Sequence, residues 1–255
     1  MDERKRVRVL DILVDVIDMD IAIDRVESWI RQRKKSYICV VPVSTIVEAV
    51  DDKDYRRIIN NADMVTPDGM PIVWSGRFKG HSKIKRVCGP DFMKKICKDP
   101  CLAHWKHFFL GTTPATLKRL ERKLRQWNPD IQVCGSYAPP VDEKARAEDE
   151  SIIAQINGVQ PDILWVGMGA PKQDYWMKLN RERLDVPVMI GVGAAFDFLA
   201  GVKPRAPEWM QRIGMEWFFR LCCEPRRLWR RYVIGNARFC FEMFKEIFRL
   251  RNVKS

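Results

Sequence analysis

Short apolar runs alternate with segments of helical periodicity over the first 202 residues. Most of these runs are continuously apolar, which is typical of strands buried on both faces of a parallel sheet. The pattern predicts strands at residues 7–16, 37–41, 64–65, 107–110, 131–134, 162–166 and 188–192. It predicts helices at residues 22–33, 44–50, 55–60, 90–98, 114–127, 142–157 and 171–182. This alternation predicts an α/β fold with a mostly parallel sheet and helices on both faces.

Local signals mark where several helices begin. Asp18 or Asp20 can cap the first helix, and Ser44 or Thr45 can cap the second. Thr113 precedes a proline and is therefore the expected cap of the helix that follows it.

After Val202 the pattern changes to one long basic helix. Its apolar residues recur at steps of three or four, at Trp229, Val233, Ala237, Cys240, Phe244 and Phe248. Such a stripe can lie on an anionic membrane, or it can pack on the protein's own core. We therefore divide the chain into an α/β core, residues 1–202, and a basic helical appendage, residues 203–255.

The net charge of +12 is concentrated in that appendage. Residues 203–255 hold thirteen Lys and Arg against five Asp and Glu. This asymmetry calls for an anionic partner, which could be a nucleic acid, a phospholipid surface or a pyrophosphate.

The eight cysteines show no regular pairing and indicate reduced thiols in a cytosolic protein. The longest apolar stretch, 186–202, contains Asp197 and falls short of the ~20 apolar residues of a membrane span.

A glycine loop follows the most apolar predicted strand. Gly167 and Gly169 lie in the sequence Gly-Met-Gly-Ala, and Pro171 is expected in the first turn of the next helix. Strand, glycine loop and helix N-terminus form an arrangement that suits an anion, although a tight turn without a ligand has the same pattern. Neither G-x-G-x-x-G nor a phosphate-binding Lys-Ser/Thr motif is present. In parallel sheets, ligands bind beyond the carboxyl ends of the strands, where this loop is expected.

Several polar residues in predicted loops are candidates for chemistry. Asp68, in Thr-Pro-Asp-Gly-Met-Pro, can act as a general base or can simply hold a turn before glycine. Arg86 can bind a phosphate, or it can pack through its aliphatic stem. Tyr137 follows a strand and can stack on a base or cap the core. Asp197 lies among apolar residues and therefore needs donors from a ligand or a helix start.

A cysteine and histidine cluster raises the question of a metal. Cys97, Cys101, His104 and His107 are spaced too closely for a zinc finger, and His107 is expected in a strand. The spacing therefore favours no metal site.

Six ordered motifs together resemble the WecG/TagA/CpsF glycosyltransferases (glycosyltransferase family 26), from about residue 8 to about residue 240. They are TPDGMP at 66–71, RVCGPD at 86–91, FFLGTTP at 108–114, PDILWVGMGAPKQDYW at 161–176, GVGAAFDFLAGVKPRAPEWM at 191–210 and EWFFRLCCEPRRLWRRY at 216–232. The resemblance implies a Rossmann-like sheet and an appendage that docks on the membrane. It implies transfer of a sugar from a UDP-sugar to a polyprenyl-diphosphate-linked saccharide, in teichoic-acid, cell-wall or exopolysaccharide synthesis.

The resemblance also implies roles for individual residues. Asp68 would be the base that deprotonates the acceptor, and Arg86 and Gln173 would lie in the active site. The residues implied for UDP are Tyr137, Gly167, Gly169 and Asp197. The appendage residues implied to lie over the diphosphate are Arg220, Arg227 and Arg230. The implied enzyme is inverting, independent of metals and cofactors, and peripheral on the cytoplasmic face of a bacterial membrane, and it binds no nucleic acid. The resemblance does not decide whether the protein forms a homo-oligomer.

The chain departs from the family at one place. The usual Thr and Asn after the second strand are replaced by Val40 and Pro42. Ser44 or Thr45 could substitute for them, the donor sugar could differ, or the enzyme could be slow.

Three other functions compete with glycosyl transfer. A nucleotide-cofactor oxidoreductase would need the glycine fingerprint that the sequence lacks. The charge leaves open a protein that binds nucleic acid, and the departure at Val40 and Pro42 leaves open an inactive membrane-docked scaffold.

Overall fold

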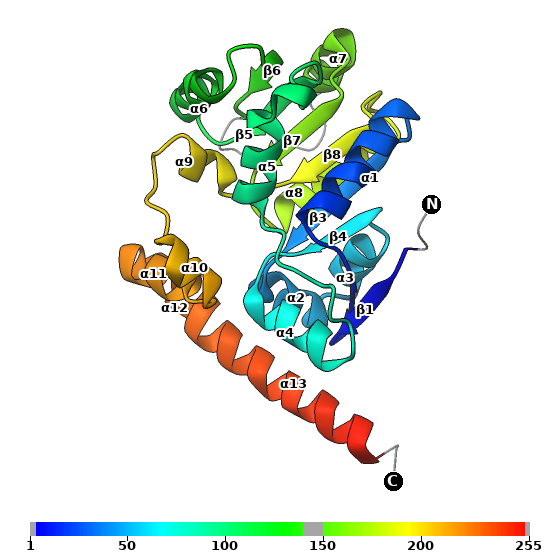
Figure 1. Ribbon diagram of the computed structural model, residues 1–255, viewed down its shortest axis with the longest axis vertical. Coiled ribbons are helices and arrows are strands. Elements are labelled where there is room, and N and C mark those ends of the chain that lie inside the picture. The colour runs from blue at the N-terminus through cyan, green and yellow to red at the C-terminus, as the bar shows by residue number, and fades with distance from the viewer. Residues whose placement is uncertain (1–3, 140–149, 253–255) are drawn as a thin grey trace.

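The computed structural model of this chain describes residues 4–139 and 150–252, with side chains up to residue 246. Its centre is a six-stranded parallel sheet with the strand order β4-β3-β8-β7-β5-β6 (Figure 1). The strands are β3 (Ser36–Val41), β4 (Met64–Pro67), β5 (Lys106–Gly111), β6 (Gln132–Tyr137), β7 (Ile163–Gly167) and β8 (Val188–Gly191). The predicted parallel sheet is therefore confirmed.

Helices cover both faces of the sheet and bury two apolar clusters against it. One face carries α2 (Val43–Asp51), α3 (Lys53–Asn60), α4 (Met70–Phe78), α7 (Glu150–Val159) and α8 (Lys172–Asn180). The other face carries α1 (Met19–Arg31), α5 (Gly89–Lys98), α6 (Pro114–Trp127) and α9 (Ala195–Leu199). A short 3₁₀ turn, η1 (Pro100–Leu102), follows α5. The fold is an α/β sandwich of three layers, as the alternating pattern predicts.

A hairpin before the sheet anchors the strand that carries Asp68. Strands β1 (Arg6–Val9) and β2 (Ile12–Asp15) pair with each other in antiparallel fashion. The buried carboxylate of Asp15 accepts hydrogen bonds from the side chains of Arg4 and Arg25 and from the backbone N–H of Val65 on β4. The two arginines pair the buried charge of Asp15. The bond to Val65 attaches the hairpin to β4.

The helix caps agree only in part with the predictions. Asp18 accepts a hydrogen bond from Ile21 N at the start of α1, and Thr113 accepts one from Thr116 N at the start of α6. The predicted cap of α2 by Ser44 or Thr45 is wrong, because α2 starts directly after Pro42 and has no side-chain cap. Pro171 is the N-cap of α8, one residue before its first turn.

Two predicted helices also need comment. Residues 142–149 of the helix predicted at 142–157 lie outside the described residues, and α7 is described from Glu150. Helix α4 is not predicted, because its sequence, MPIVWSGRF, contains Pro and Gly and lacks a clear helical period.

All regular elements of the described C-terminal segment, residues 203–252, are helical. These are α10 (Glu208–Arg212), α11 (Glu216–Cys223), α12 (Pro225–Trp229), a π-helical turn (Arg230–Ile234) and α13 (Gly235–Asn252). The first three cluster together, and α13 runs obliquely away from them past α2 and α4 (Figure 1). Of the described helices, none combines the length and the apolar character that a membrane span requires.

The face that the C-terminal helices bury differs from the predicted stripe. The side chains that pack on the protein are Leu228, Tyr232, Phe239 and Met243. The stripe from Trp229 to Phe244 is exposed instead. The alternative that the C-terminal helix packs on the protein's own core is confirmed for α13, but through Phe239 and Met243 and not through the predicted stripe, so the helices carry two apolar faces.

Candidate active site

The main pocket lies where the topology of the sheet reverses. Neighbouring strands β3 and β8 lead into α2 and α9, which pack on opposite faces of the sheet. This divergence opens a crevice at the carboxyl ends of the strands, the usual ligand site of such sheets. The pocket is lined by the segments after β3, β4, β7 and β8 and by residues of α11, α12, the π-helical turn and α13.

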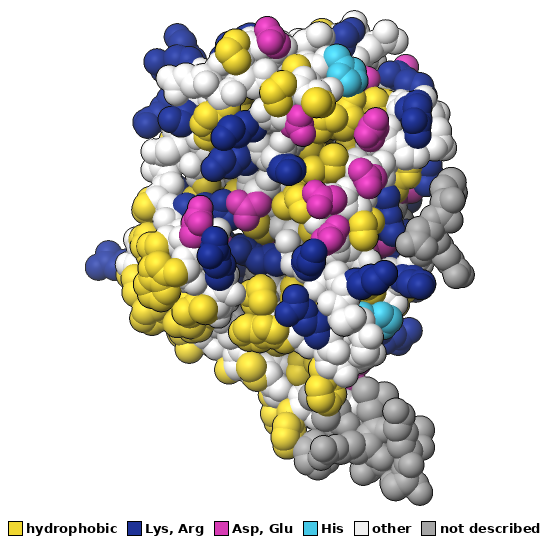
Figure 2. All heavy atoms as spheres, viewed as in Figure 1, with side chains coloured by type: hydrophobic (Ala, Val, Ile, Leu, Met, Phe, Trp, Pro, Cys, Tyr) yellow, Lys and Arg dark blue, Asp and Glu magenta, His cyan; other side chains and the backbone are white. Residues whose placement is uncertain are grey.

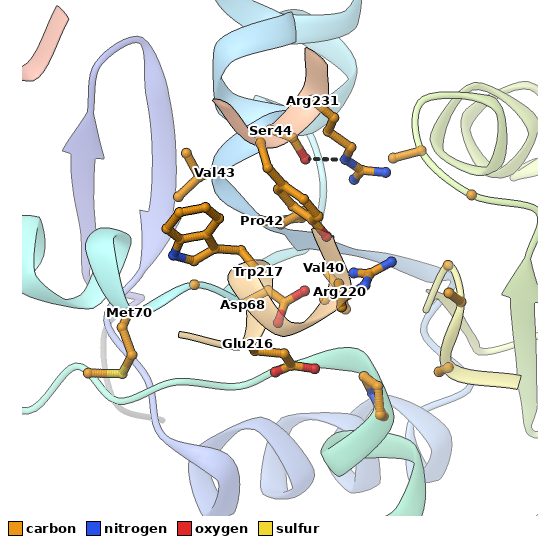
Figure 3. Close-up of a pocket in the computed structure, with 18 of the residues that line it drawn as sticks. Val40, Pro42, Val43, Ser44, Asp68, Met70, Glu216, Trp217, Arg220 and Arg231 are labelled. Carbon is orange, nitrogen blue, oxygen red and sulfur yellow. Dashed lines mark hydrogen bonds between the residues drawn. The ribbon is translucent and has the colours of Figure 1, made fainter. Parts of the chain in front are cut away.

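Asp68 faces this pocket from the end of β4 (Figure 3). Its backbone is held on both sides, because its N–H donates to Val41 O and its carbonyl accepts from Arg86 Nε at 2.6 Å. In the described part of the chain, the Asp68 carboxylate accepts no hydrogen bond from the backbone. The side chain therefore does not hold a turn, and its oxygens are available to a ligand. Burial raises the pKa of Asp68, although Arg86 opposes this shift. A rigid, accessible carboxylate with a raised pKa suits a general base.

Arg86 connects Asp68 to the C-terminal segment. Its Nη2 lies 2.5 Å from Glu216 Oε2 and 3.6 Å from Asp68 Oδ1. Glu216 belongs to α11 and also lies 3.6 Å from Arg205 Nε. Sequence reasoning missed Glu216, although it opens the last of the six motifs.

Gln173 holds two loops of the pocket together. Its side chain is only 2% exposed. Its Oε1 accepts hydrogen bonds from Gly169 N at 3.2 Å and from Gly193 N at 2.9 Å, which follow β7 and β8 respectively. The structure thus places Gln173 in the wall of the pocket as a clamp between adjacent loops.

A buried acid lies next to that clamp. Asp174 accepts a hydrogen bond from the hydroxyl of Tyr55 at 2.7 Å. Burial raises the pKa of Asp174 to about 6, while hydrogen bonds from Tyr55, Cys39 and Gln173 oppose the shift. This network fixes the start of α8 and, with it, the backbone at Gln173.

We expect Gln173→Leu to damage both stability and activity. The change leaves the N–H groups of Gly169 and Gly193 without their acceptor, at a cost of about 1–3 kcal/mol in the free energy of unfolding. The loosened loops should lower the rate of the reaction in the pocket about tenfold or more. Denaturant unfolding and initial rates measure both effects, with Gln126→Leu on the exposed face of α6 as the control. Wild-type values for both would refute the clamp.

The arginines of the C-terminal segment divide between the pocket and the surface. Arg220 lies in the pocket, over the rings of Phe198 and Tyr232. Arg227 and Arg231 also line it, as expected for two residues one helical turn apart. Arg230 lies outside the described lining, with its guanidinium over the ring of Trp229. Sequence reasoning named Arg230 and missed Arg231.

The segment after β3 brings one of its two hydroxyl residues into the pocket. Ser44 lines the pocket and accepts a hydrogen bond from Arg231 Nε at 2.8 Å (Figure 3). Thr45 is buried outside the described lining. Val40 and Pro42 both line the pocket and give this wall an apolar surface. Of the two expected substitutes, only Ser44 therefore reaches the ligand space.

The residues expected around UDP are distributed over the carboxyl ends of three strands, β6, β7 and β8. Gly169 lines the pocket with a positive φ of 83°, whereas Gly167, Tyr137 and Asp197 lie outside its described lining. Tyr137 ends β6 next to β5. Asp197 accepts a hydrogen bond from the hydroxyl of Thr112 at 3.0 Å and pairs with Lys203.

Gly167 has a structural reason to be glycine. A Cβ at this position would lie 2.6 Å from the ring of Phe196. The residue therefore allows α9 to pack closely against β7, whatever ligand the strand ends bind.

The cysteine and histidine cluster is dispersed in the structure. Cys97 is buried, and His107 Nδ1 accepts a hydrogen bond from the indole of Trp165 at 3.1 Å. Burial lowers the pKa of His107 to about 4. Over the described residues, no group of three or more His, Cys, Asp or Glu side chains is arranged to hold a metal ion.

Comparison with known proteins identifies the family of this chain. The model of the glycosyl transferase WecG/TagA/CpsF family matches residues 7–253. The N-acetylglucosaminyldiphosphoundecaprenol N-acetyl-beta-D-mannosaminyltransferase of Bacillus subtilis (strain 168) is 27% identical over 219 residues, which cover 86% of this chain and 82% of that protein. The protein of the same name from Staphylococcus aureus (strain NCTC 8325 / PS 47) is 28% identical over 235 residues, covering 90% and 91%. The chain therefore belongs to the WecG/TagA/CpsF family and is a glycosyl transferase.

Proposed function

We propose that this enzyme transfers the sugar of a UDP-sugar to a saccharide carried on a polyprenyl diphosphate, with inversion at the anomeric carbon. The observation that carries the proposal is the carboxylate of Asp68, which faces a pocket ringed by Arg86, Arg220, Arg227 and Arg231. The relatives support the acceptor class, because their names describe transfer to N-acetylglucosaminyldiphosphoundecaprenol.

The proposed reaction is a single displacement. An oxygen of Asp68 takes the proton of the acceptor hydroxyl while the hydroxyl oxygen attacks the anomeric carbon. The bond between that carbon and the UDP phosphate oxygen breaks, and UDP leaves with the bonding electrons. The arginines stabilise the negative charge that develops on UDP, a role that a metal ion has in many other transferases.

The strand ends next to the pocket are the proposed place for UDP. Gly167 ends β7, Gly169 follows it, and Asp197 follows the adjacent strand β8, whereas Tyr137 ends β6, which β5 separates from β7. One extended ligand that runs along these strand ends would reach Asp68. The positive φ of Gly169 opens its loop for close approach by a phosphate.

We also propose that residues 203–255 form an appendage that docks on the cytoplasmic face of a membrane. Large exposed apolar side chains gather on α4, on the C-terminal segment and at its turns; they are Trp74, Phe78, Trp209, Ile213, Phe218, Trp229, Val233, Ile234, Phe241 and Phe244. We call this set the apolar patch. Figure 2 shows hydrophobic side chains over the region of α10 to α12 and along α13.

Contacts between the elements bring the parts of the patch on α4 and on the C-terminal segment close together. A Cβ at Gly214, between α10 and α11, would lie 2.9 Å from Met70 Cβ on α4. Helix α13 lies along α4 too, where Lys79 pairs with Glu246 at 2.7 Å. Exposed arginines flank the patch, and a surface with aromatic and basic side chains fits an anionic bilayer.

UDP release from a panel of UDP-sugars tests the proposed reaction. The panel is run with and without a short-chain polyprenyl-diphosphate-GlcNAc acceptor. We expect one donor to release UDP only when the acceptor is present, since attack requires the activated hydroxyl. No release from any donor, together with no binding of UDP, would refute the proposed substrates.

A further inference from the structure

Glu216 is a charged residue of the pocket that the proposed reaction does not use. It projects from α11, and its side chain is 16% exposed. Figure 3 shows its carboxylate close to that of Asp68, facing the same space. Asp68 and Glu216 are two acids in one pocket, and neighbouring groups affect each acid differently. We therefore expect them to have different roles.

The partner that distinguishes them is Arg86. Its Nε donates to the backbone carbonyl of Asp68 at 2.6 Å, so the guanidinium is already tied to the Asp68 loop. Its Nη2 makes its short bond to Glu216, at 2.5 Å, whereas the Asp68 carboxylate lies 3.6 Å away, beyond hydrogen-bond distance. The charge-assisted bond of Arg86 therefore goes to Glu216.

We propose that Glu216 is a positioning residue that keeps Asp68 available as the base by holding the Arg86 guanidinium away from the Asp68 carboxylate. This inference rests on the proposed function. An arginine released from Glu216 would pair directly with Asp68, because carboxylate and guanidinium form strong forked pairs. That pair would occupy the oxygens that must take the proton and would weaken the carboxylate as a base.

The surroundings of Asp68 agree with this role. The charged and titratable groups that act on it are Arg86, Cys88, Arg205, Glu216, Arg220 and Tyr232. Burial raises the pKa of Asp68 most, Arg86 opposes the shift, and Glu216 raises the pKa again. Loss of the Glu216 charge therefore lowers the pKa of the base.

The location of Glu216 also couples the base to the C-terminal segment. Asp68 and Arg86 belong to residues 1–202, whereas Glu216 lies on α11 beyond them. The bond from Glu216 to Arg86 therefore depends on the packing of α11 against the pocket.

The test is the pH profile of kcat/KM for full-length Glu216→Gln, with the donor and acceptor found in the UDP-sugar panel. A general base works in its ionised form, so activity falls as pH drops through its pKa. We expect the acid limb of the profile to move to lower pH in Glu216→Gln, and the plateau to fall about tenfold because the base is weaker. If Glu216→Gln is too slow to measure, a smaller shift in the same direction is expected in Glu216→Asp, which keeps the charge but whose shorter side chain loosens the bond to Arg86.

Glu208→Gln is the matched control, because Glu208 lies on α10 in the same segment, pairs with exposed Arg212 and lies outside the described pocket lining. Its profile should equal that of the wild type. An unchanged acid limb in Glu216→Gln, even with a reduced rate, would refute the proposal.

The variant Asp68→Asn separates this inference from the proposed function. If Asp68→Asn is inactive and the limb of Glu216→Gln is unchanged, only the role of Glu216 fails. If Asp68→Asn retains transfer and Glu216→Gln abolishes it, Glu216 is itself the base and both assignments fail.

Discussion

The variant Asp68→Asn is expected to lose sugar transfer by about 10²- to 10⁴-fold, the usual contribution of a general base. Asparagine has nearly the same shape but cannot take the proton of the acceptor hydroxyl. The backbone of residue 68 is held by Val41 and Arg86 through main-chain atoms, so the loop should persist in the variant. UDP binding should stay within about twofold of wild type, since the proposed UDP contacts lie on other strand ends.

Initial rates of UDP release with acceptor, together with calorimetric titration of UDP, measure both expectations. Asp185→Asn is the control, because Asp185 lies just before the amino end of β8, whereas the pocket lies at the carboxyl ends of the strands, and its side chain is 58% exposed. Transfer near the wild-type rate in Asp68→Asn would remove Asp68 from the reaction. Loss of UDP binding together with transfer would indicate that the substitution damages the pocket as a whole.

The second large effect is expected at the apolar patch. The double variant Trp209→Asp, Phe241→Asp should bind vesicles of phosphatidylglycerol about 10²- to 10⁴-fold more weakly, if each buried aromatic side chain contributes about 1.5–3 kcal/mol. Both side chains are more than half exposed in the structure, at 63% and 58%. Neither lies in the described lining of the pocket, so transfer to a short-chain acceptor free in solution should be unaffected.

Vesicle sedimentation measures the binding. Transfer to the short-chain acceptor in solution is measured in parallel and shows whether catalysis is intact. Leu179→Asp is the control, because Leu179 is 59% exposed at the end of α8, outside the patch. Raised salt or replacement of phosphatidylglycerol by phosphatidylcholine should also weaken wild-type binding, since the segment is basic. If the double variant binds like the wild type, the patch is not the docking surface.

Comparison of the predicted and observed elements shows where local signals suffice. The strands at residues 37–41 and 162–166 and the caps at Asp18 and Thr113 depend on neighbours in sequence, and the structure has them. Proline and glycine after a predicted strand located the loop of Asp68. The carboxyl ends of parallel strands lie at the same edge of the sheet, so a ligand site was expected there. The prediction that Ser44 or Thr45 caps α2 failed because Pro42 is itself the N-cap.

The periodicity of the C-terminal helix illustrates the limit of such reasoning. Steps of three and four identify a helix but do not say which apolar face meets the protein when two faces qualify. The structure buries Phe239 and Met243 and exposes Val233 and Phe244. That choice depends on the surface offered by α2 and α4, which periodicity does not contain.

By itself, the sequence determined the alternation of strands and helices, the ends of the sheet where ligands bind, and the family. Only the tertiary structure decided which charged groups meet in the pocket. Arg86 and Glu216 are 130 residues apart in the chain, and Ser44 and Arg231 are 187 apart. Such pairs form because the whole sheet and the C-terminal segment bring distant residues within hydrogen-bond distance, and no local pattern encodes that distance.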